Sequence, residues 1–305
     1  MKAFHAERAP LDLPPGHTFP STKYRRLRTR VEAWPDLAVR EAEPASDAVL
    51  VLAHTAAYVQ AVAGNGLTLA EQRAIGFPWS EAMVERSRRS VGATIAAART
   101  ALAEGIAANL AGGTHHARAD RGSGFCVFND VAVAARLLQT EATPSLRACV
   151  VDLDVHQGDG TAAIFAGDPG VYTLSLHGEK NFPFRKATSD LDVALPDGCG
   201  DEAYLAALDA ALAALWTEHD ACPFGIAFYL AGADPHEGDR LGRLRLTQAG
   251  LLERDRRVLG ALHARRIPVA LSMAGGYGRD IDVTVDIQAA TLREAIASWQ
   301  RWNRR

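Results

Sequence analysis

Short, almost wholly apolar runs alternate along the chain with longer segments in which apolar residues recur at helical spacing. The short runs are bounded by glycine or polar residues, which predicts buried strands over 148–154, 171–177, 225–230 and 267–273. The longer segments predict helices over 22–33, 47–63, 81–104, 129–138, 159–166, 201–218, 247–264 and 287–299. The rest of the first forty residues is expected to be irregular. This order of strands and helices is typical of a parallel sheet with helices on both faces.

The strand predicted at 148–154 leads into a cluster of metal-binding residue types, Asp152, Asp154 and His156. If strand geometry continues, these side chains are two residues apart and point to the same side. Ligands of parallel sheets bind outside the carboxyl ends of the strands. Two carboxylates that converge on one imidazole repel each other unless a cation lies between them. The alternative is a solvated strand end without metal, but the pattern favours a cation site.

Other predicted strands also end in residues with useful chemistry, namely His177, Asp234 and Tyr277. Asp154, His156 and Asp234 together match the three protein ligands of a catalytic zinc site, which keeps a fourth position open. Asp234 alone would be interpreted more simply as an aspartate that caps a loop. The ligand role of Asp234 is favoured only because Asp154 and His156 are expected at the same edge of the sheet.

The adjacent histidines His115 and His116 lie in a glycine-rich loop that is expected at the same edge of the sheet. Such a pair could serve as the general base and the electrostatic partner for a metal-bound water. Each ring needs a carboxylate to set its tautomer. Asp152 and Asp159 remain for this task once Asp154 is assigned to the metal.

Three aromatic residues are expected on the same side of the sheet. Tyr277 follows two glycines, so its phenol can reach into a cavity from a tight loop. It is predicted to donate a hydrogen bond to a carbonyl oxygen that becomes an oxyanion, with a core tyrosine as the alternative. Phe125 and Phe182 either belong to the core or line a narrow apolar channel for an alkyl chain.

The composition is that of a globular enzyme. Of the 305 residues, 48% are hydrophobic and 23% charged, and no repeat or linker divides them, which predicts a single catalytic domain over 1–305. The net charge of −3 leaves no basic footprint for nucleic acid, and no apolar run is long enough to span a membrane. The four cysteines form no CxxC pair and the N-terminus lacks a secretory signal, so the cytoplasm is the expected location.

Several of these motifs occur in the order in which a known family carries them. They are Gly-Gly-Thr-His115-His116, Gly124-Phe-Cys, Asp152-Leu-Asp-Val-His-Gln-Gly-Asp159-Gly, Ser175-Leu-His, Ala-Gly-Ala-Asp234-Pro and Gly-Gly-Tyr277. From about residue 16 to 297, the chain resembles the arginase/deacetylase superfamily and, within it, the zinc-dependent histone deacetylases. His-Gln-Gly in place of His-His-Gly is similar to the class IV branch, above all to its bacterial members.

This resemblance implies an eight-stranded parallel sheet between helices and two kinds of metal ion. The residues that would hold zinc, or alternatively ferrous iron, are Asp154, His156 and Asp234. A structural monovalent cation, usually potassium, would lie beneath the zinc. Its ligands would come from Asp152, Asp154, His156, Ser175 and Leu176.

The resemblance also implies roles for the remaining site residues. His116, paired with Asp159, would be the general base, and His115, paired with Asp152, the electrostatic second histidine. Tyr277 would bind the scissile carbonyl. The substrate channel would be lined by Gly124, Phe125 and Phe182.

The predicted function is therefore the hydrolysis of an acyl group from a primary amine, most simply Nε-acyl-lysine of a protein or peptide. One alternative is a deacetylase of small acetylated amines such as polyamines or metabolites, and another is a non-catalytic acyl-lysine binder. Retention of both histidines and of Tyr277 argues against the binder. The rim sequence Ile75-Gly-Phe-Pro78 lacks the carboxylate with which class I members grip a peptide, which leaves small or lipid-like acyl substrates open. Acyl-chain length and oligomeric state are not predicted.

Overall fold

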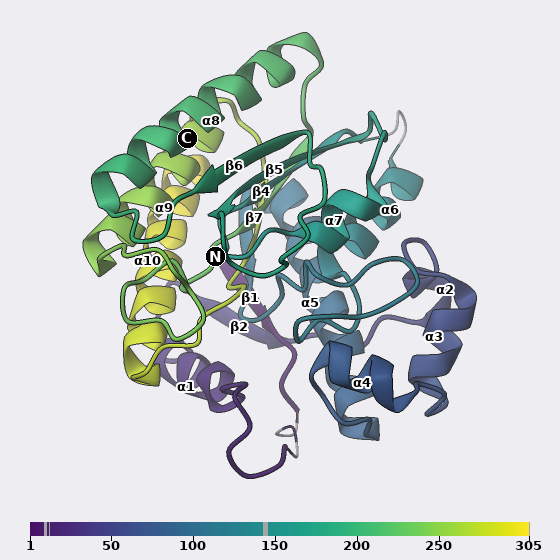
Figure 1. Cartoon of the computed structure of the whole chain (residues 1–305). Helices are drawn as coiled ribbons and strands as arrows, with labels where there is room; N and C mark the ends of the chain where they lie inside the picture. The colour runs from purple at the N-terminus through teal and green to yellow at the C-terminus, as the bar shows by residue number, and fades with distance from the viewer. Residues whose placement is uncertain (9–10, 12, 143–145, 305) are drawn as a thin grey trace.

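A computed structural model describes residues 1–8, 11, 13–142 and 146–304 of the chain (Figure 1). The described strands form one sheet in the order β2-β1-β3-β8-β7-β4-β5-β6, and every neighbouring pair is parallel. The strands are β1 (Lys2–His5), β2 (Ala38–Glu41), β3 (Ile106–Asn109), β4 (Ala148–Asp152), β5 (Val171–Gly178), β6 (Leu191–Leu195), β7 (Ile226–Leu230) and β8 (Val269–Ser272). Because all strands run the same way, their carboxyl ends meet at one edge of the sheet.

Helices cover both faces of this sheet and complete three layers, as Figure 1 shows. One face carries α1 (Thr22–Val31), α8 (Asp201–Ala221), α9 (Gln248–Ala264) and α10 (Ile281–Asn303). The other side carries α2 (Asp47–Leu50), α3 (Ala56–Ala63), α4 (Leu69–Ile75), α5 (Glu81–Glu104), α6 (Asp130–Glu141) and α7 (Asp159–Ile164). The predicted fold class, a three-layer α/β/α domain with a parallel sheet, is confirmed.

Strand β4 shows why its sequence is apolar without interruption. It pairs with β5 on one side and β7 on the other. Cys149 and Val151 face the core beneath α8, α9 and α10, whereas Ala148 and Val150 face the core beneath α5 and α6. A central strand of a parallel sheet is buried on both faces, so it needs no polar alternation. The strand therefore ends abruptly where the first polar residue, Asp152, reaches the carboxyl edge.

The long helix α5 coincides with the range predicted from sequence, because both of its ends carry clear signals. The Ser80 hydroxyl accepts a hydrogen bond from the Met83 N–H at 3.1 Å, which caps the first turn. Gly105 ends the helix at a φ of 91°, where a Cβ would lie 2.4 Å from the ring of Trp302. Only glycine suits this position.

Four strands were missed, and the expectation that the first forty residues are irregular outside one helix is wrong. β1 and all but the last residue of β2 lie within that region, and both strands have only four residues. β3 follows α5 after a single glycine, and β6 is an edge strand whose residues alternate between half-buried and exposed up to the buried Leu195. The segment 47–63 contains two helices, α2 and α3, rather than one. Among the described helices, none is both long and apolar enough to cross a membrane.

Candidate active site

The stretch after β4 departs from the strand geometry assumed above. The strand ends at Asp152, so Asp154 and His156 do not continue its alternation. Side-chain oxygens replace a neighbouring strand as acceptors: Asp152 Oδ1 accepts from the Asp154 N–H at 3.2 Å, and Asp234 Oδ1 accepts from the Val155 N–H at 2.9 Å. The residues still converge, but they do so because a bend gathers them and not because they share a strand face.

Asp154, His156 and Asp234 each offer a ligand atom within 4.8 Å of the others. His156 Nδ1 lies 3.0 Å from Asp154 Oδ1 and 3.4 Å from Asp234 Oδ2. A tetrahedral ion with bonds of about 2.0–2.2 Å holds its ligand atoms roughly 3.3–3.6 Å apart. Within the described part of the chain, these three residues are the group that could hold a metal ion.

The electrostatics of this cluster also fit a cation. Asp154 and Asp234 are 1% and 0% exposed, and Asp234 Oδ2 has no hydrogen-bond partner among the described residues. Burial and the neighbouring Asp154 carboxylate raise the pKa of Asp234, so the ionised form is disfavoured without a positive charge nearby. The Gly275 N–H donates to Asp154 Oδ2 at 2.7 Å, and a Cβ at Gly275 would lie 1.8 Å from Asp234 Oδ2. The residues present therefore fit a divalent metal.

The histidine pair is held against this cluster by the start of α6. Asp130 accepts hydrogen bonds from the Gly113 N–H at 3.0 Å and the Thr114 N–H at 2.8 Å. Gly113 has a φ of 69°, and a Cβ there would lie 2.5 Å from the Ala274 Cβ. The loop that carries the histidines thus packs directly on the loop that carries Tyr277, and glycine permits that contact.

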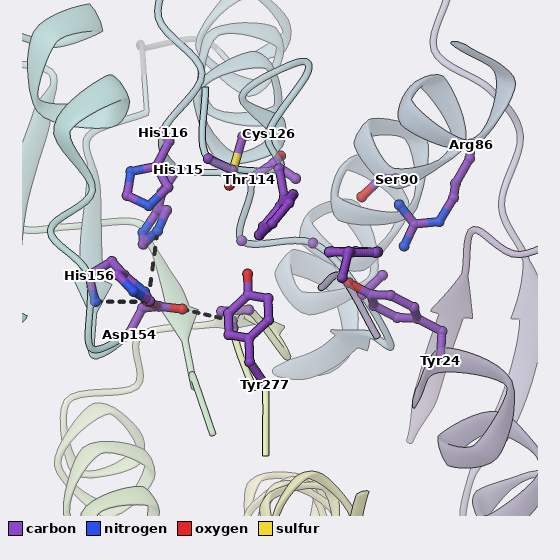
Figure 2. A pocket seen from close by; sticks show the side chains of 18 residues that line it. Tyr24, Arg86, Ser90, Thr114, His115, His116, Cys126, Asp154, His156 and Tyr277 are labelled. Atoms are coloured by element: carbon purple, nitrogen blue, oxygen red, sulfur yellow. Dashed lines mark hydrogen bonds and ion pairs between the residues drawn. The ribbon is translucent and has the colours of Figure 1, made fainter. Parts of the chain in front are cut away.

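Each histidine meets the carboxylate predicted for it. His115 Nδ1 lies 2.7 Å from Asp152 Oδ2, and His116 Nδ1 lies 2.7 Å from Asp159 Oδ1. Figure 2 shows both rings beside Asp154 and His156. With Nδ1 donating to a carboxylate, Nε2 of each neutral ring is left to accept a proton.

The two rings differ in the direction of their pKa shifts. Burial favours the neutral form of His115, but the carboxylates of Asp152 and Asp154 outweigh it and raise its pKa to about 9. Burial and the charge of His115 lower the pKa of His116 to about 4. His116 is therefore the neutral member of the pair, with its Nε2 unprotonated and open to act as a proton acceptor.

Arg118 was not predicted, and it shares the Asp159 carboxylate with His116. Its Nη2 donates to Asp159 Oδ2 at 2.9 Å, while its carbonyl lies 2.9 Å from His54 Nδ1. An arginine beside this carboxylate keeps it ionised and fixes its orientation. Its position two residues after the histidine pair is the signal that could have found it.

Tyr277 is positioned by contacts on both sides of its loop. The Tyr277 N–H donates to Asp239 Oδ2 at 2.6 Å, and its carbonyl accepts from Arg240 Nε at 2.9 Å. The ammonium of Lys23, which is fully buried, donates to the carbonyls of Gly276 at 3.1 Å and Ala274 at 3.4 Å. In Figure 2 the Tyr277 hydroxyl points into the space beside the histidines.

Arg254 of α9 supports the same edge from below. It is fully buried and binds Asp255 Oδ1 through Nε at 2.9 Å. Its Nη1 donates to the carbonyls of Gly232 at 2.6 Å and Leu153 at 3.4 Å. These carbonyls precede the carboxylates of the metal-ligand cluster by one or two residues, so Arg254 ties the ends of β4 and β7 together.

Sequence reasoning missed Lys23 and Arg254, although a signal existed for both. Lys23 stands four and eight residues before the buried Leu27 and Val31, on the apolar face of α1. Arg254 likewise lies among buried leucine and valine positions of α9. A charged residue at an apolar-face position indicates a buried polar contact, but it does not say with which partner.

Two adjacent cavities, which share several lining residues, open onto these residues. An outer cavity of about 390 Å³ is lined by Ala74, His116, Ser123, Gly124, Phe125, His156, Phe182, Leu241 and Tyr277. An inner cavity of about 40 Å³ continues past Tyr277 to Thr114, Ser90, Tyr24 and Arg86 (Figure 2). The three residues predicted for a substrate channel thus lie together on the walls of the outer cavity.

The residues predicted to hold a structural monovalent cation lie next to one another. Asp152 pairs with Ser175 in the register between β4 and β5, and Leu176 follows in the same strand. The Ser175 hydroxyl lies 2.9 Å from His177 Nδ1. Their role in binding an ion stays a prediction. His177 lies within β5 and packs on this serine.

Comparison with known proteins gives the class of the molecule first. The structure resembles an HDAC homolog in complex with SAHA, with a TM-score of 0.76 and 24% identity, covering 93% of this chain and 80% of that one. It also resembles the HD domain of HDA15, with a TM-score of 0.75 and 22% identity, covering 97% and 89% of the two chains. The fold is thus the arginase/deacetylase fold.

The histone deacetylase domain pattern matches residues 17–292. The chain is 44% identical over 273 residues to an uncharacterized protein of Picosynechococcus sp., covering 88% of this chain and 89% of that one. It is 34% identical over 193 residues to histone deacetylase 2 of Arabidopsis thaliana, covering 62% and 49% of the two chains. It is 38% identical over 164 residues to acetoin utilization protein AcuC of Bacillus subtilis, covering 50% and 42%. The matched parts therefore span about half of the latter two proteins.

The chain belongs to the histone deacetylase family. It is a hydrolase that acts on amide bonds.

Proposed function

We propose that this protein is a zinc-dependent deacylase that hydrolyses the amide of Nε-acyl-lysine, with the whole chain acting as one catalytic domain. The observation that carries the proposal is that His115, His116, Asp154, His156 and Tyr277 line one cavity. Asp234 completes the ligand cluster beside them, and Asp152 and Asp159 hold the two histidines. Zinc held by the three ligands would supply a Lewis acid for the amide carbonyl and would lower the pKa of a water molecule to about 7.

The chain's own residues would carry the proton transfers. His116 is neutral and hydrogen-bonded to Asp159 through Nδ1, so its Nε2 can take the proton from the attacking water. The same proton can pass to the amine nitrogen when the carbon–nitrogen bond breaks, which leaves a carboxylic acid and lysine. His115, held by Asp152, stabilises negative charge nearby.

Tyr277 would stabilise the oxygen of the reacting carbonyl. Its hydroxyl points into the space beside the two histidines, where Tyr277 also lines the inner cavity (Figure 2). A hydrogen bond that strengthens as negative charge develops lowers the barrier more than it strengthens substrate binding. The Asp239 and Arg240 contacts to its backbone keep the ring in place while this happens.

A potassium ion at Asp152, Asp154, His156, Ser175 and Leu176 is proposed as a structural component. It would stabilise the junction of β4 and β5 beneath the metal site. Its removal is expected to lower the thermal midpoint without removing zinc.

Deacetylation of polyamines is the alternative that the cavity favours least. Polyamines carry further cationic nitrogens, which need carboxylates or aromatic faces outside the reacting centre. Among the described residues, the outer cavity is lined by no carboxylate, so the rings of Phe125, Phe182 and Tyr277 are all that it offers a second cationic nitrogen. An acyl-lysine side chain has no second charge at this depth and suits these walls.

A substrate panel tests the proposal. Zinc-reconstituted protein is incubated with an acetyl-lysine peptide, peptides with longer acyl groups on lysine, and acetylated polyamines, and the release of free amine is followed. Hydrolysis of at least one acyl-lysine peptide, with much slower turnover of polyamines, is expected. Turnover of polyamines alone would overturn the proposed substrate class.

A further inference from the structure

The wall of the outer cavity continues to the protein surface as a row of aromatic rings. The ring of Phe182 lies 4.9 Å from that of His116, in a perpendicular arrangement. The ring of Phe184 lies 6.2 Å from that of Phe182, again nearly perpendicular. His116 is 4% exposed, whereas Phe184 is 86% exposed. The row therefore leads from the proposed base to an aromatic side chain in solvent.

A second apolar side chain is fixed to the same wall. Leu241 lines the outer cavity and is 41% exposed. Asn181 Nδ2 donates to the Leu241 carbonyl at 2.8 Å, and Lys186 Nζ donates to the carbonyls of Asn181 at 2.6 Å and Pro183 at 2.7 Å. These bonds tie the loop of Phe184 to the loop of Leu241. We call these two exposed side chains the mouth, because Leu241 lines the outer cavity and Phe184 neighbours Phe182, which lines it too.

Phe184 is unusual among the exposed apolar residues of the described chain. The large hydrophobic side chains with substantial exposure are Val51, Leu69, Leu102, Phe184 and Leu241. Phe184 is the most exposed of them and the one aromatic member. A single exposed apolar residue is ordinary on a protein surface. What distinguishes Phe184 is that its ring neighbours Phe182, which lines the outer cavity, so that a substrate bound in this cavity can cover it.

The segment that carries Phe184 is also basic. The segment 178–186 carries one acidic residue, Glu179, and three basic ones, Lys180, Arg185 and Lys186. The outer cavity itself is lined by no carboxylate. A peptide with arginine or lysine beside the acylated lysine would meet like charges wherever it approaches this segment, whereas an apolar neighbour would meet Phe184 and Leu241.

We propose that Phe184, together with Leu241, determines substrate specificity by contacting an apolar side chain adjacent to the acylated lysine of a peptide. This inference rests on the proposed acyl-lysine hydrolase function. It assigns the substrate to peptides or proteins, since a small acylated amine would not reach Phe184. It also disfavours the strongly basic sequences that surround many acylated lysines.

The test compares Phe184→Ser with the wild type on three substrates: an acetyl-lysine peptide flanked by leucine, the same peptide flanked by arginine, and Nε-acetyl-lysine with blocked termini. For the wild type we expect kcat/KM to favour the leucine peptide over the arginine peptide. Phe184→Ser should lose about tenfold on the leucine peptide, the scale of a partly buried aromatic contact. Its loss on blocked acetyl-lysine should be at least about five times smaller, since that substrate ends before the mouth.

Two control variants sharpen this comparison. Phe184→Leu retains an apolar side chain and should keep most of the preference for leucine. Leu102→Ser removes another exposed apolar residue. It lies at the end of α5 that leads into β3, and therefore at the opposite edge of the sheet, so kcat/KM for both peptides should stay unchanged. Unchanged kinetics of Phe184→Ser on the leucine peptide, or equal losses on all three substrates, would overturn the proposal.

Binding measurements separate this proposal from the proposed function. The affinities of the uncleaved peptides are measured with Tyr277→Phe protein, with and without Phe184→Ser. Tighter binding of the leucine peptide that depends on Phe184 supports the specificity role even if the wild type hydrolyses no acyl-lysine, an outcome that would refute the hydrolase function alone. Equal affinities with and without Phe184 would refute the specificity role alone.

Discussion

The floor and the mouth of the cavity are built in opposite ways. The floor consists of Asp154, His156 and Asp234, which are buried and polar, and backbone N–H groups orient both carboxylates. The mouth is formed by Phe184 and Leu241, which are apolar, exposed and carried by loops. A polar cluster at this depth tolerates little change, because an unpaired buried charge costs several kcal/mol, whereas an exposed side chain can change almost freely. The comparison suggests that the floor decides which reaction occurs and that the mouth decides which substrate undergoes it.

The largest effect is expected from His156→Ala. This change removes one of three ligands and leaves two buried carboxylates without the imidazole between them. We expect loss of stoichiometric zinc and of detectable hydrolysis, measured by metal analysis and by rate. His219→Ala, at the end of α8, is the matched control and should keep its zinc. A full complement of zinc in His156→Ala would show that the floor is not the metal site.

Tyr277→Phe should separate catalysis from metal binding. Removing one donor to a developing oxyanion costs about 2.7–4 kcal/mol, so kcat should fall roughly 100- to 1000-fold while zinc stays bound. Tyr172→Phe on β5, remote from the cavity, should behave as the wild type. Near-wild-type turnover of the Tyr277 variant would exclude its hydroxyl from the reaction.

Arg254→Lys should weaken the floor without touching a ligand. Lysine keeps the buried charge beside Asp255 but cannot reproduce the fork of hydrogen bonds to the Gly232 and Leu153 carbonyls. Residues that orient metal ligands typically contribute 10- to 100-fold to metal affinity, so the zinc dissociation constant should rise by about that factor. Arg257→Lys, on the same helix but partly exposed, should leave it unchanged. Equal zinc affinities for both variants would mean that Arg254 serves folding alone.

Asn181→Ala should act on the mouth and spare the floor. It removes the side-chain bonds to the Leu241 carbonyl and the Arg243 N–H, at a cost of about 1–3 kcal/mol. We expect KM for a peptide to rise a few-fold and the thermal midpoint to fall by a few degrees, with kcat and zinc content unchanged. Asn303→Ala, which removes bonds near the end of α10, controls for the loss of stability. A fall in kcat as large as the rise in KM would show that the mouth also affects the chemical step, which contradicts this division of roles.

The sequence predicted the floor better than it predicted the architecture around it. The strands missed, such as β3 and β6, are short or lie at an edge, and their patterns do not differ from those of helix ends or loops. The candidate catalytic residues stand in motifs with fixed spacing at strand ends, so their convergence follows from parallel topology. The residues converge even though the assumption of a continuous strand to His156 was wrong, because a bend after Asp152 brings Asp154 and His156 together.

The supporting contacts could not be predicted, because they join residues far apart in the chain. Lys23 reaches the Tyr277 loop across more than 250 positions, and Arg254 reaches Leu153 across 101. The sequence shows that each is a charge on an apolar face, but the partner depends on how the helices pack. The exposure of Phe184 is likewise invisible in sequence, where Asn-Phe-Pro-Phe suggests only an apolar loop.

Zinc titration of the metal-free protein tests the central account most directly. Release of acetate from an acetyl-lysine peptide is followed while zinc is added in known amounts. The account predicts no turnover without metal, a linear rise in rate and a break at one equivalent of zinc per chain. Full activity in the metal-free protein, or a break at two equivalents, would contradict a single metal held by Asp154, His156 and Asp234.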